Sequence, residues 1–181
     1  MRVIAGSLKG RRLKAPTWDG LRPTSDRLRE TLFNILAPRI AGARVLDGYA
    51  GTGAVGIEAL SRGAAQVTFV ERDRRAVGLI RENLAVCRVE QGYTIEGGDV
   101  ISVLQRPGMA GSFELILLDP PYDIINVTDA LAAAAPCLSS GGLLVLERAR
   151  QREFAVPAAL DRVRDVASGD SSLTFFTMTR P

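Results

Sequence analysis

Four consecutive residues, Asp119-Pro120-Pro121-Tyr122, have the chemistry to hold a planar ring that carries an amino group. They follow an apolar run at 113–118 that predicts a strand buried on both faces. Because proline lacks an N–H and fixes φ, the strand must stop here and the loop must be stiff. A carboxylate and a backbone carbonyl can accept N–H bonds, and an aromatic face can stack on the ring. Taken alone, the same string could be a proline-rich turn capped by an aspartate.

A glycine-rich segment at 47–56 contains Gly51, Gly53 and Gly56 in the G-x-G-x-x-G spacing, between a predicted strand and a predicted helix. This spacing alone leaves a nicotinamide dehydrogenase open. Asp47, at the end of the preceding strand, would repel a pyrophosphate but attract a cationic ligand. S-adenosylmethionine carries a sulfonium and an ammonium and no phosphate, so it suits this segment, and glycine lets the backbone approach it closely.

Acidic residues recur where four successive predicted strands end, at Asp47, Glu71, Asp99 and Asp119. The carboxyl ends of parallel strands meet at one edge of a sheet, so these side chains should line one rim. We expect Glu71 to accept both ribose hydroxyls and Asp99 to accept the adenine amino group. Asp99, like Asp73, could instead be a helix N-cap. Four acids in register with the glycine segment favour the cofactor interpretation.

Strand and helix patterns alternate from residue 43 onward, which predicts an α/β fold with a parallel sheet, right-handed crossovers and helices on both faces. The predicted strands are 44–47, 67–71, 93–96, 113–118 and 143–147, and the predicted helices are 51–62, 73–86, 99–104 and 126–138. Residues 162–167 and 173–179 predict a terminal hairpin around Gly169-Asp170. Bulky residues on both faces, at Phe175, Phe176 and Met178, place its last strand inside the sheet.

The N-terminal segment precedes this pattern. Residues 1–14 predict a small hairpin or an extended arm, and residues 15–23 predict a loop. A helix should then start at Thr24 or Ser25 as N-cap, with Asp26 in its first turn. Its apolar face is Leu28, Leu32, Phe33 and Leu36, and Pro38 should end it.

The net charge of +3 is unevenly distributed. The first 29 residues have a net charge of +6, and the other 152 residues therefore have about −3. The cations of this basic arm are Arg2, Lys9, Arg11, Arg12, Lys14, Arg22, Arg27 and Arg29. Arginines beside a helix N-terminus favour phosphate binding, so the arm predicts a nucleic-acid partner. A solvated basic tail is the alternative.

Composition excludes several classes of site. There is no histidine, which removes histidine-dependent nucleophilic catalysis and histidine-bound zinc. Cys87 and Cys137 lack metal-ligand spacing and are expected to be core thiols, as in a reducing cytoplasm. No apolar run approaches 18 residues and the N-terminus does not read as a signal peptide, so no membrane span is expected.

On these residues the chain resembles the bacterial RsmD-type 16S rRNA guanine-N2 methyltransferases over nearly its whole length. The Arg-Pro-Thr helix start is more specific than the glycine segment, which all class I methyltransferases share. The matching stretches are Met1-Arg2-Val3-Ile4-Ala5-Gly6, Lys9-Gly10-Arg11-Arg12-Leu13, Arg22-Pro23-Thr24 through Arg29-Glu30, Leu32-Phe33-Asn34-Ile35-Leu36, 51–63, 119–122 and Gly169-Asp170-Ser171-Ser172-Leu173. The chain departs from the pattern at Tyr49, where Phe is expected, and at Arg148 after Glu147, where His is frequent. The role of residues 147–150 is therefore open.

The resemblance implies a Rossmann-like class I methyltransferase fold, with seven mostly parallel strands, an antiparallel last strand and helices on both faces. It implies methyl transfer from S-adenosylmethionine to the N2 amine of a guanine in 16S rRNA, in the assembled or assembling small ribosomal subunit. A basic arm or hairpin at 1–23 would precede a methyltransferase domain at 24–181 within one globular unit. We expect a cytoplasmic monomer that needs no metal.

Three groups of site residues follow from this interpretation. The catalytic group is Asp119, Pro120 and Tyr122. The cofactor group is Asp47, Tyr49, Gly51, Gly53, Glu71, Arg72, Asp99 and Val100. The RNA-binding group is Arg2, Lys9, Arg11, Arg12, Arg22, Thr24 and Arg27.

Three other functions stay open from the residues alone. A DNA or RNA methyltransferase acting on adenine N6 or cytosine N4 would share the Asp-Pro-Pro-Tyr logic, although so short a chain lacks room for a DNA target-recognition domain. An NAD-dependent dehydrogenase would use the glycine segment. A non-catalytic RNA chaperone would use only the basic arm.

Overall fold

The computed structural model describes residues 1–18, 25–121 and 127–179. Its strands are β1 (Arg44–Gly48), β2 (Gln66–Glu71), β3 (Tyr93–Gly97), β4 (Phe113–Leu118), β5 (Leu138–Ala149), β6 (Leu160–Ser168) and β7 (Ser171–Met178). Its helices are α1 (Asp26–Ile40), α2 (Ala54–Ser61), α3 (Arg74–Val86), α4 (Val100–Leu104) and α5 (Val127–Ala134), followed by a 3₁₀ turn at Ala135–Cys137. Every predicted element is therefore present, with shifts at some boundaries.

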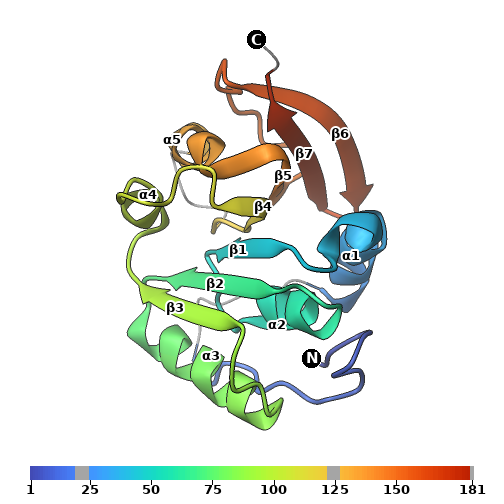
Figure 1. Ribbon diagram of the computed structural model, residues 1–181. Coiled ribbons are helices and arrows are strands. Elements are labelled where there is room, and N and C mark those ends of the chain that lie inside the picture. Colours follow the sequence, from blue (N-terminus) through green and yellow to red (C-terminus); the bar gives the residue numbers. More distant parts are fainter. Residues whose placement is uncertain (19–24, 122–126, 180–181) are drawn as a thin grey trace.

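The strands form one seven-stranded sheet in the order β3-β2-β1-β4-β5-β7-β6 (Figure 1). The strands β1 to β5 pair in parallel, and β7 pairs antiparallel with both β5 and β6. This confirms the predicted α/β fold with an antiparallel last strand inside the sheet. Because β1 and β4 are neighbours while β2 lies on the other side of β1, the chain reverses direction across the sheet between them. Ligands bind at such a switch point.

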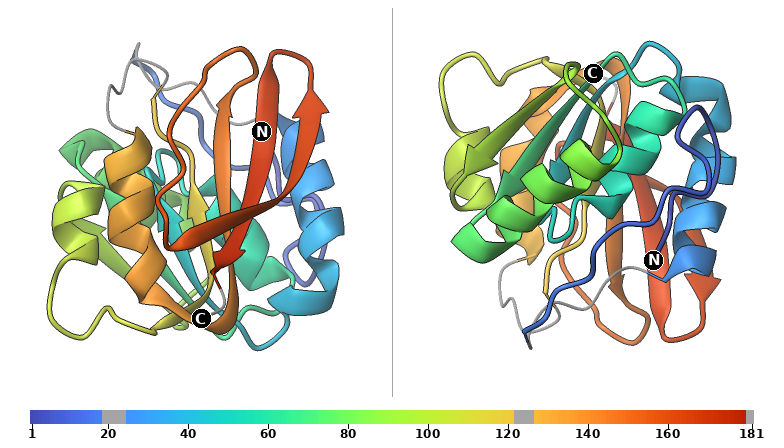
Figure 2. Two further views of the ribbon diagram at one scale, coloured as in Figure 1. Left: turned by 90° about the horizontal axis from the view of Figure 1, so that it is seen from above. Right: turned by 90° about the horizontal axis from the view of Figure 1, so that it is seen from below.

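Helices cover both faces of the sheet (Figure 2) and create two cores. The first core contains buried residues of α1, α2 and α3, and the second contains buried residues of α4 and α5. Phe175 belongs to the first core and Phe176 to the second, both essentially without exposure. Their alternation on β7 confirms that this strand is buried on both faces. Cys87 and Cys137 are free and buried, as expected.

Three predicted helix boundaries were wrong. The helix α1 continues through Pro38 to Ile40, because Ile40 is buried and packs its last turn into the first core. The helix α2 begins at Ala54 rather than Gly51, since Gly51 and Gly53 have left-handed φ angles of 54° and 75°. The helix α5 ends at Ala134 instead of reaching residue 138, because the chain tightens there into the 3₁₀ turn that contains Pro136.

The N-terminal residues form a small hairpin, defined here as residues 1–14. Val3 N donates to Arg11 O at 3.0 Å and Gly10 N donates to Val3 O at 2.9 Å. The hairpin lies tightly against the end of α2, where Ser7 N donates to Ser61 O at 2.8 Å. A Cβ on Gly6, whose φ is 83°, would come within 1.9 Å of Ser61 O. Only glycine permits this approach.

The start of α1 agrees with the prediction. Ser25 is the N-cap, and its Oγ accepts from Leu28 N at 3.2 Å. Asp26 stands in the first turn, where its charge suits the helix dipole. Thr24, the alternative cap, lies outside the described residues. None of the helices in the described ranges combines the length and the apolarity that crossing a bilayer requires.

Candidate active site at the carboxyl edge of the sheet

Asp47 and Glu71, on β1 and β2, and Asp119, directly after β4, meet at the carboxyl edge of the sheet. Asp47 is 3% exposed, and its Oδ2 accepts from Gly56 N at 2.8 Å. Burial raises the pKa of Asp47 to about 8, against the opposing effect of the Gly56 hydrogen bond. The charges of Asp119 and Glu71 raise it further. A cation bound at this edge would lower that pKa again, because it would offset the repulsion between the ionised carboxylates.

Glu71 uses both carboxylate oxygens to position backbone. Its Oε2 accepts from Gly51 N at 2.9 Å, and its Oε1 accepts from Asp73 N at 2.8 Å. One carboxylate thus connects the glycine segment to the start of α3. Because each carboxylate oxygen has a second lone pair, these bonds are compatible with the predicted contact to ribose hydroxyls.

The glycine segment is a turn of left-handed residues followed by a closely packed helix. Tyr49, Gly51 and Gly53 have φ angles of 63°, 54° and 75°. Gly56 has a different role, because a Cβ there would lie 2.2 Å from Phe69 Cε1 on β2. The first two glycines of the motif therefore shape the turn, and the third lets α2 lie against the sheet.

Asp99 is the N-cap of α4, as the alternative interpretation had it. Its Oδ1 accepts from Ser102 N at 3.0 Å and from Ser102 Oγ at 3.2 Å. Tyr49 is half-buried, and its burial together with the nearby charge of Asp99 raises the pKa of its hydroxyl to about 12. The charge of Arg72 acts in the opposite direction. Val100 is 2% exposed and belongs to the second core. Both cap hydrogen bonds use Oδ1 of Asp99, so its Oδ2 is the oxygen that the predicted adenine contact would use.

The predicted catalytic loop starts beside the glycine segment. Asp119 is half-buried, Pro120 is buried and Pro121 is exposed. Asp119 N donates to Gly48 O at 3.3 Å, which joins the end of β4 to the end of β1. Tyr122 lies outside the described residues. The strand stops at Leu118, as the two prolines predicted.

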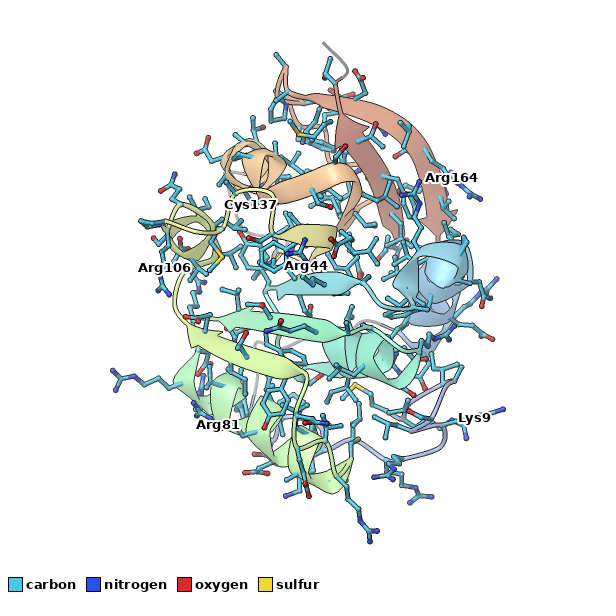
Figure 3. All side chains as sticks on the ribbon, viewed as in Figure 1. Lys9, Arg44, Arg81, Arg106, Cys137 and Arg164 are labelled. Atoms are coloured by element: carbon cyan, nitrogen blue, oxygen red, sulfur yellow. The ribbon has the colours of Figure 1, made fainter. Side chains whose placement is uncertain are left out.

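The predicted RNA-binding residues divide by exposure. Arg22 and Thr24 lie outside the described residues. Arg11 is half-buried, and its guanidinium donates to Cys87 O, which fastens the hairpin to the end of α3. Lys9 points away from the body at the tip of the hairpin (Figure 3). Four predicted cations are exposed: Arg2, Lys9, Arg12 and Arg27.

Arg29 is not a surface phosphate ligand, although it was expected to flank a phosphate site. Its side chain is 0% exposed, and burial lowers its pKa. Its Nη2 donates to Arg2 O at 2.5 Å and to Asp26 Oδ1 at 3.0 Å. The guanidinium therefore fastens the hairpin to α1 instead of meeting solvent.

Two buried polar residues that the sequence interpretation missed hold the hairpin in place. Glu58 on α2 is 0% exposed and accepts from Ile4 N at 2.7 Å, from Ala5 N at 3.0 Å and from Arg62 Nε at 2.7 Å. Its carboxylate thus satisfies two backbone N–H groups of the hairpin. A charged residue inside an otherwise apolar helix was the available signal.

Asn83 on α3 connects the hairpin to the cofactor side. It is 0% exposed, and its Oδ1 accepts from Lys14 N at 2.7 Å. Its Nδ2 donates to Lys14 O at 3.2 Å and to Thr52 O, in the glycine segment, at 2.9 Å. Asn83 stands on the apolar face that Ile80 and Leu84 define, and this was the signal for its importance.

Arg148 gives the segment at 147–150 a structural role. Its Nε donates to Thr174 Oγ1 at 3.0 Å, and its Cζ lies 5.5 Å from the centroid of the Phe154 ring. Its Nη1 also donates to three backbone carbonyls of the following turn, those of Ala149, Arg150 and Arg152. The departure from the family pattern therefore stabilises the turn after β5.

The chain is similar to known methyltransferases over nearly its whole length. The family model described as "Conserved hypothetical protein 95" matches residues 1–177. Ribosomal RNA small subunit methyltransferase D of Haemophilus influenzae is 34% identical over 173 residues, covering 93% of this chain and 89% of that protein. Its namesake in Escherichia coli strain K12 is 43% identical over 122 residues, covering 67% of this chain and 60% of that protein.

Solved structures agree with this relationship. The yhhF protein of Escherichia coli superposes with a TM-score of 0.85 at 33% identity, over 98% of this chain and 97% of that chain. The HI0767 protein of Haemophilus influenzae gives a TM-score of 0.79 at 28% identity, over 99% of this chain and 98% of that chain.

The carboxylates and the left-handed turn suit a ligand that has cationic groups and hydroxyls, and a pyrophosphate-binding dehydrogenase is not favoured. This chain belongs to the RsmD family of class I methyltransferases, which use S-adenosylmethionine as methyl donor.

Proposed function

We propose that this chain methylates the exocyclic N2 amine of a guanine in 16S rRNA of the small ribosomal subunit. The observation that carries the proposal is the hydrogen bond of 3.3 Å from Asp119 N to Gly48 O. This bond joins the loop that begins at Asp119 to the end of β1, where the glycine segment begins. A methyl donor held by that segment and an amine held by Asp119 would then be neighbours.

The cofactor end of the site is assigned to residues of the glycine segment and its surroundings. S-adenosylmethionine, when bound, supplies an electrophilic methyl group. Glu71 would hold the ribose hydroxyls, the remaining oxygen of Asp99 would accept from the adenine amino group, and Asp47 would favour the cationic end. Backbone of Gly51 and Gly53 would lie against the ligand. Other predicted contacts are Tyr49, Arg72 and Val100.

The catalytic end has to activate a weak nucleophile. The lone pair of the guanine amine is delocalised into the ring, and the nitrogen becomes tetrahedral and positive as it attacks. The Asp119 carboxylate and the Pro120 carbonyl would accept its two N–H bonds and stabilise the growing charge, which is worth about 3–4 kcal/mol. Alignment of the two reactants would contribute more, up to roughly 7–11 kcal/mol. The product ammonium is acidic, so no strong general base is needed.

Tyr122 is proposed to stack on the target base, which must first leave its own stack at a cost of about a few kcal/mol. The exposed cations of the basic arm would bind phosphates. In this proposal the arm at 1–23 serves the RNA and the domain at 24–181 performs the transfer, within a monomer that needs no metal. A ribosomal substrate also places the proposed activity in the cytoplasm.

The direct test is incubation with labelled S-adenosylmethionine and either naked 16S rRNA or isolated small subunits, followed by nucleoside analysis. We expect label in N2-methylguanosine and expect Asp119→Ala to remove it. Label in N6-methyladenosine would instead favour the adenine alternative. That alternative has one observation in its favour, since a tRNA1(Val) (adenine(37)-N6)-methyltransferase of Shewanella putrefaciens is 27% identical over 128 residues.

A further inference from the structure

Trp18 is an aromatic residue that the proposed mechanism does not use, and it lies at the edge of the active site. The Cζ of Arg75 stands 5.1 Å from the centroid of its ring. Arg75 is in the first turn of α3, four residues after Glu71 at the end of β2. In both views of Figure 2 the blue N-terminal segment, where it meets the grey trace, and the yellow end of β4 lie at the same end of the sheet.

Trp18 is held from two directions. Lys14 lies four residues before Trp18 in the chain, and the side chain of Asn83 binds its backbone N–H and carbonyl. On the side of α3, Arg75 is oriented by Asp73, with Nη2 to Oδ2 at 2.9 Å and Nε to Oδ1 at 3.3 Å. The arginine that backs the indole ring is therefore itself positioned by the N-cap of α3.

The surroundings of Trp18 suit RNA. The ring is partly exposed and Arg75 stands over it, while the exposed Arg72 and Arg74 come shortly before Arg75 in the chain. Aromatic rings among cations are how proteins bind single-stranded nucleic acids, because bases stack on the ring while cations contact phosphates. S-adenosylmethionine is itself cationic and has no phosphate, so it gains nothing from the charge of Arg75 beside the ring.

We propose that Trp18, backed by Arg75, is a stacking platform for an unpaired RNA base that flanks the target nucleotide. The proposal rests on the proposed RNA substrate and extends it to a specific contact. A cation over one face of the indole keeps the ring in place, and partial exposure leaves ring surface for the base. The platform would hold the RNA strand at the entrance while the neighbouring base enters the site.

Fluorescence can test this directly, because Trp18 is the single tryptophan of the chain. We would titrate the full-length protein with a short single-stranded RNA oligonucleotide, and separately with S-adenosylhomocysteine. Stacking predicts that RNA quenches the emission while S-adenosylhomocysteine alone leaves it unchanged. Quenching by S-adenosylhomocysteine alone would show that Trp18 lies over the cofactor, and this would overturn the proposal. RNA binding without any change in the emission of Trp18 would overturn it as well.

Variants provide a second measurement. Trp18→Ala should weaken RNA binding by roughly 5- to 100-fold, the range expected for loss of one stacked base. Trp18→Phe should retain most of the affinity, and both variants should bind S-adenosylhomocysteine as the parent does. Arg81→Ala removes one exposed cation elsewhere on α3 (Figure 3) and shows how much RNA affinity the loss of a single charge costs.

Two failures can be told apart. If Trp18→Ala binds RNA as tightly as the parent, and the parent still methylates 16S rRNA, the platform is wrong and the proposed function stands. If the parent neither binds nor methylates rRNA, the proposed function fails and the platform fails with it. Thermal unfolding of Trp18→Ala, followed by circular dichroism, shows whether lost binding reflects a lost fold.

Discussion

The cofactor side of the site and the basic hairpin both depend on buried polar contacts, but these contacts span very different distances along the chain. Gly56 N reaches Asp47 across 9 residues, and Gly51 N reaches Glu71 across 20. In the hairpin, Ile4 N reaches Glu58 across 54 residues and Lys14 N reaches Asn83 across 69. The cofactor side is thus built by adjacent βα units, whereas the hairpin depends on side chains that the completed fold brings to it.

Asn83 is where the two regions meet, since its one side chain contacts both Lys14 and Thr52. Damage to Glu71 should therefore affect the cofactor side and leave the hairpin in place. Damage to Asn83 should affect the hairpin and the glycine segment together. Five substitutions, ordered by decreasing effect, test that distinction.

Asp119→Ala should lower methyl transfer by roughly 10²- to 10³-fold, the usual effect of removing one preorganised electrostatic group. Binding of S-adenosylhomocysteine, measured by calorimetry, should stay near that of the parent, because the glycine segment is braced by Asp47 and Glu71. Full turnover by this variant would rule out the role assigned to the carboxylate.

Glu71→Ala should weaken S-adenosylhomocysteine binding by roughly 5- to 100-fold, since the ribose hydroxyls would lose hydrogen bonds worth about 1–3 kcal/mol in total. The N–H groups of Gly51 and Asp73 would lose their acceptor as well. Glu114→Ala is the matched control, because its ion pair with Arg44 is exposed and lies at the other end of β1 and β4. Calorimetry that finds equal affinity for both variants would show that the ribose assignment is wrong.

Asn83→Ala should lower the free energy of unfolding by about 1–3 kcal/mol and weaken both ligands, because its three hydrogen bonds join two regions. Asn83→Asp should be worse at neutral pH, since a carboxylate would face two carbonyls. Urea unfolding measures the loss of stability, and titrations with RNA and with S-adenosylhomocysteine measure the loss of binding. Glu82→Gln, which removes only the exposed ion pair with Lys14, is the control and should change little.

Asp47→Asn should change the pH dependence of stability. The folded protein holds the proton of Asp47 up to a pKa of about 8, while the unfolded chain loses it near the ordinary value of 3.8. Between those values the unfolded state binds fewer protons, so this group makes stability fall as pH rises from about 4 to about 8. Urea unfolding at pH 5, 7 and 9 should show a flatter profile for the variant. An unchanged profile would contradict the raised pKa.

Lys9→Ala should have the smallest effect. Removing one phosphate contact should reduce the slope of log affinity against log salt by about 0.7–0.9 and leave methyl transfer at saturating RNA unchanged. Arg164→Ala, which removes an exposed cation of β6 (Figure 3), should keep the parental slope. A parental affinity that does not depend on salt would support the solvated-tail interpretation of the arm.

The succession of elements along the chain and the chemistry at the strand ends could be predicted because the signals are local. Apolar runs and alternating helix patterns predicted every element, and Asp47 and Glu71 indeed meet at one edge. The helix ends were less predictable. Burial of Ile40 carries α1 past Pro38, and left-handed glycines delay the start of α2. Boundaries depend on packing that a local pattern does not contain.

The elements of the sheet, the glycine turn and the acidic edge follow from local sequence, because a βα unit places its own loop beside its own strand. The positions of polar residues whose partners are distant depend on the complete fold. Arg29 looked like a phosphate ligand and is buried, while Asn83 looked like an ordinary helical residue and joins two regions. Buried polar groups must find hydrogen-bond partners, and only the completed fold determines which backbone groups are near enough to provide them.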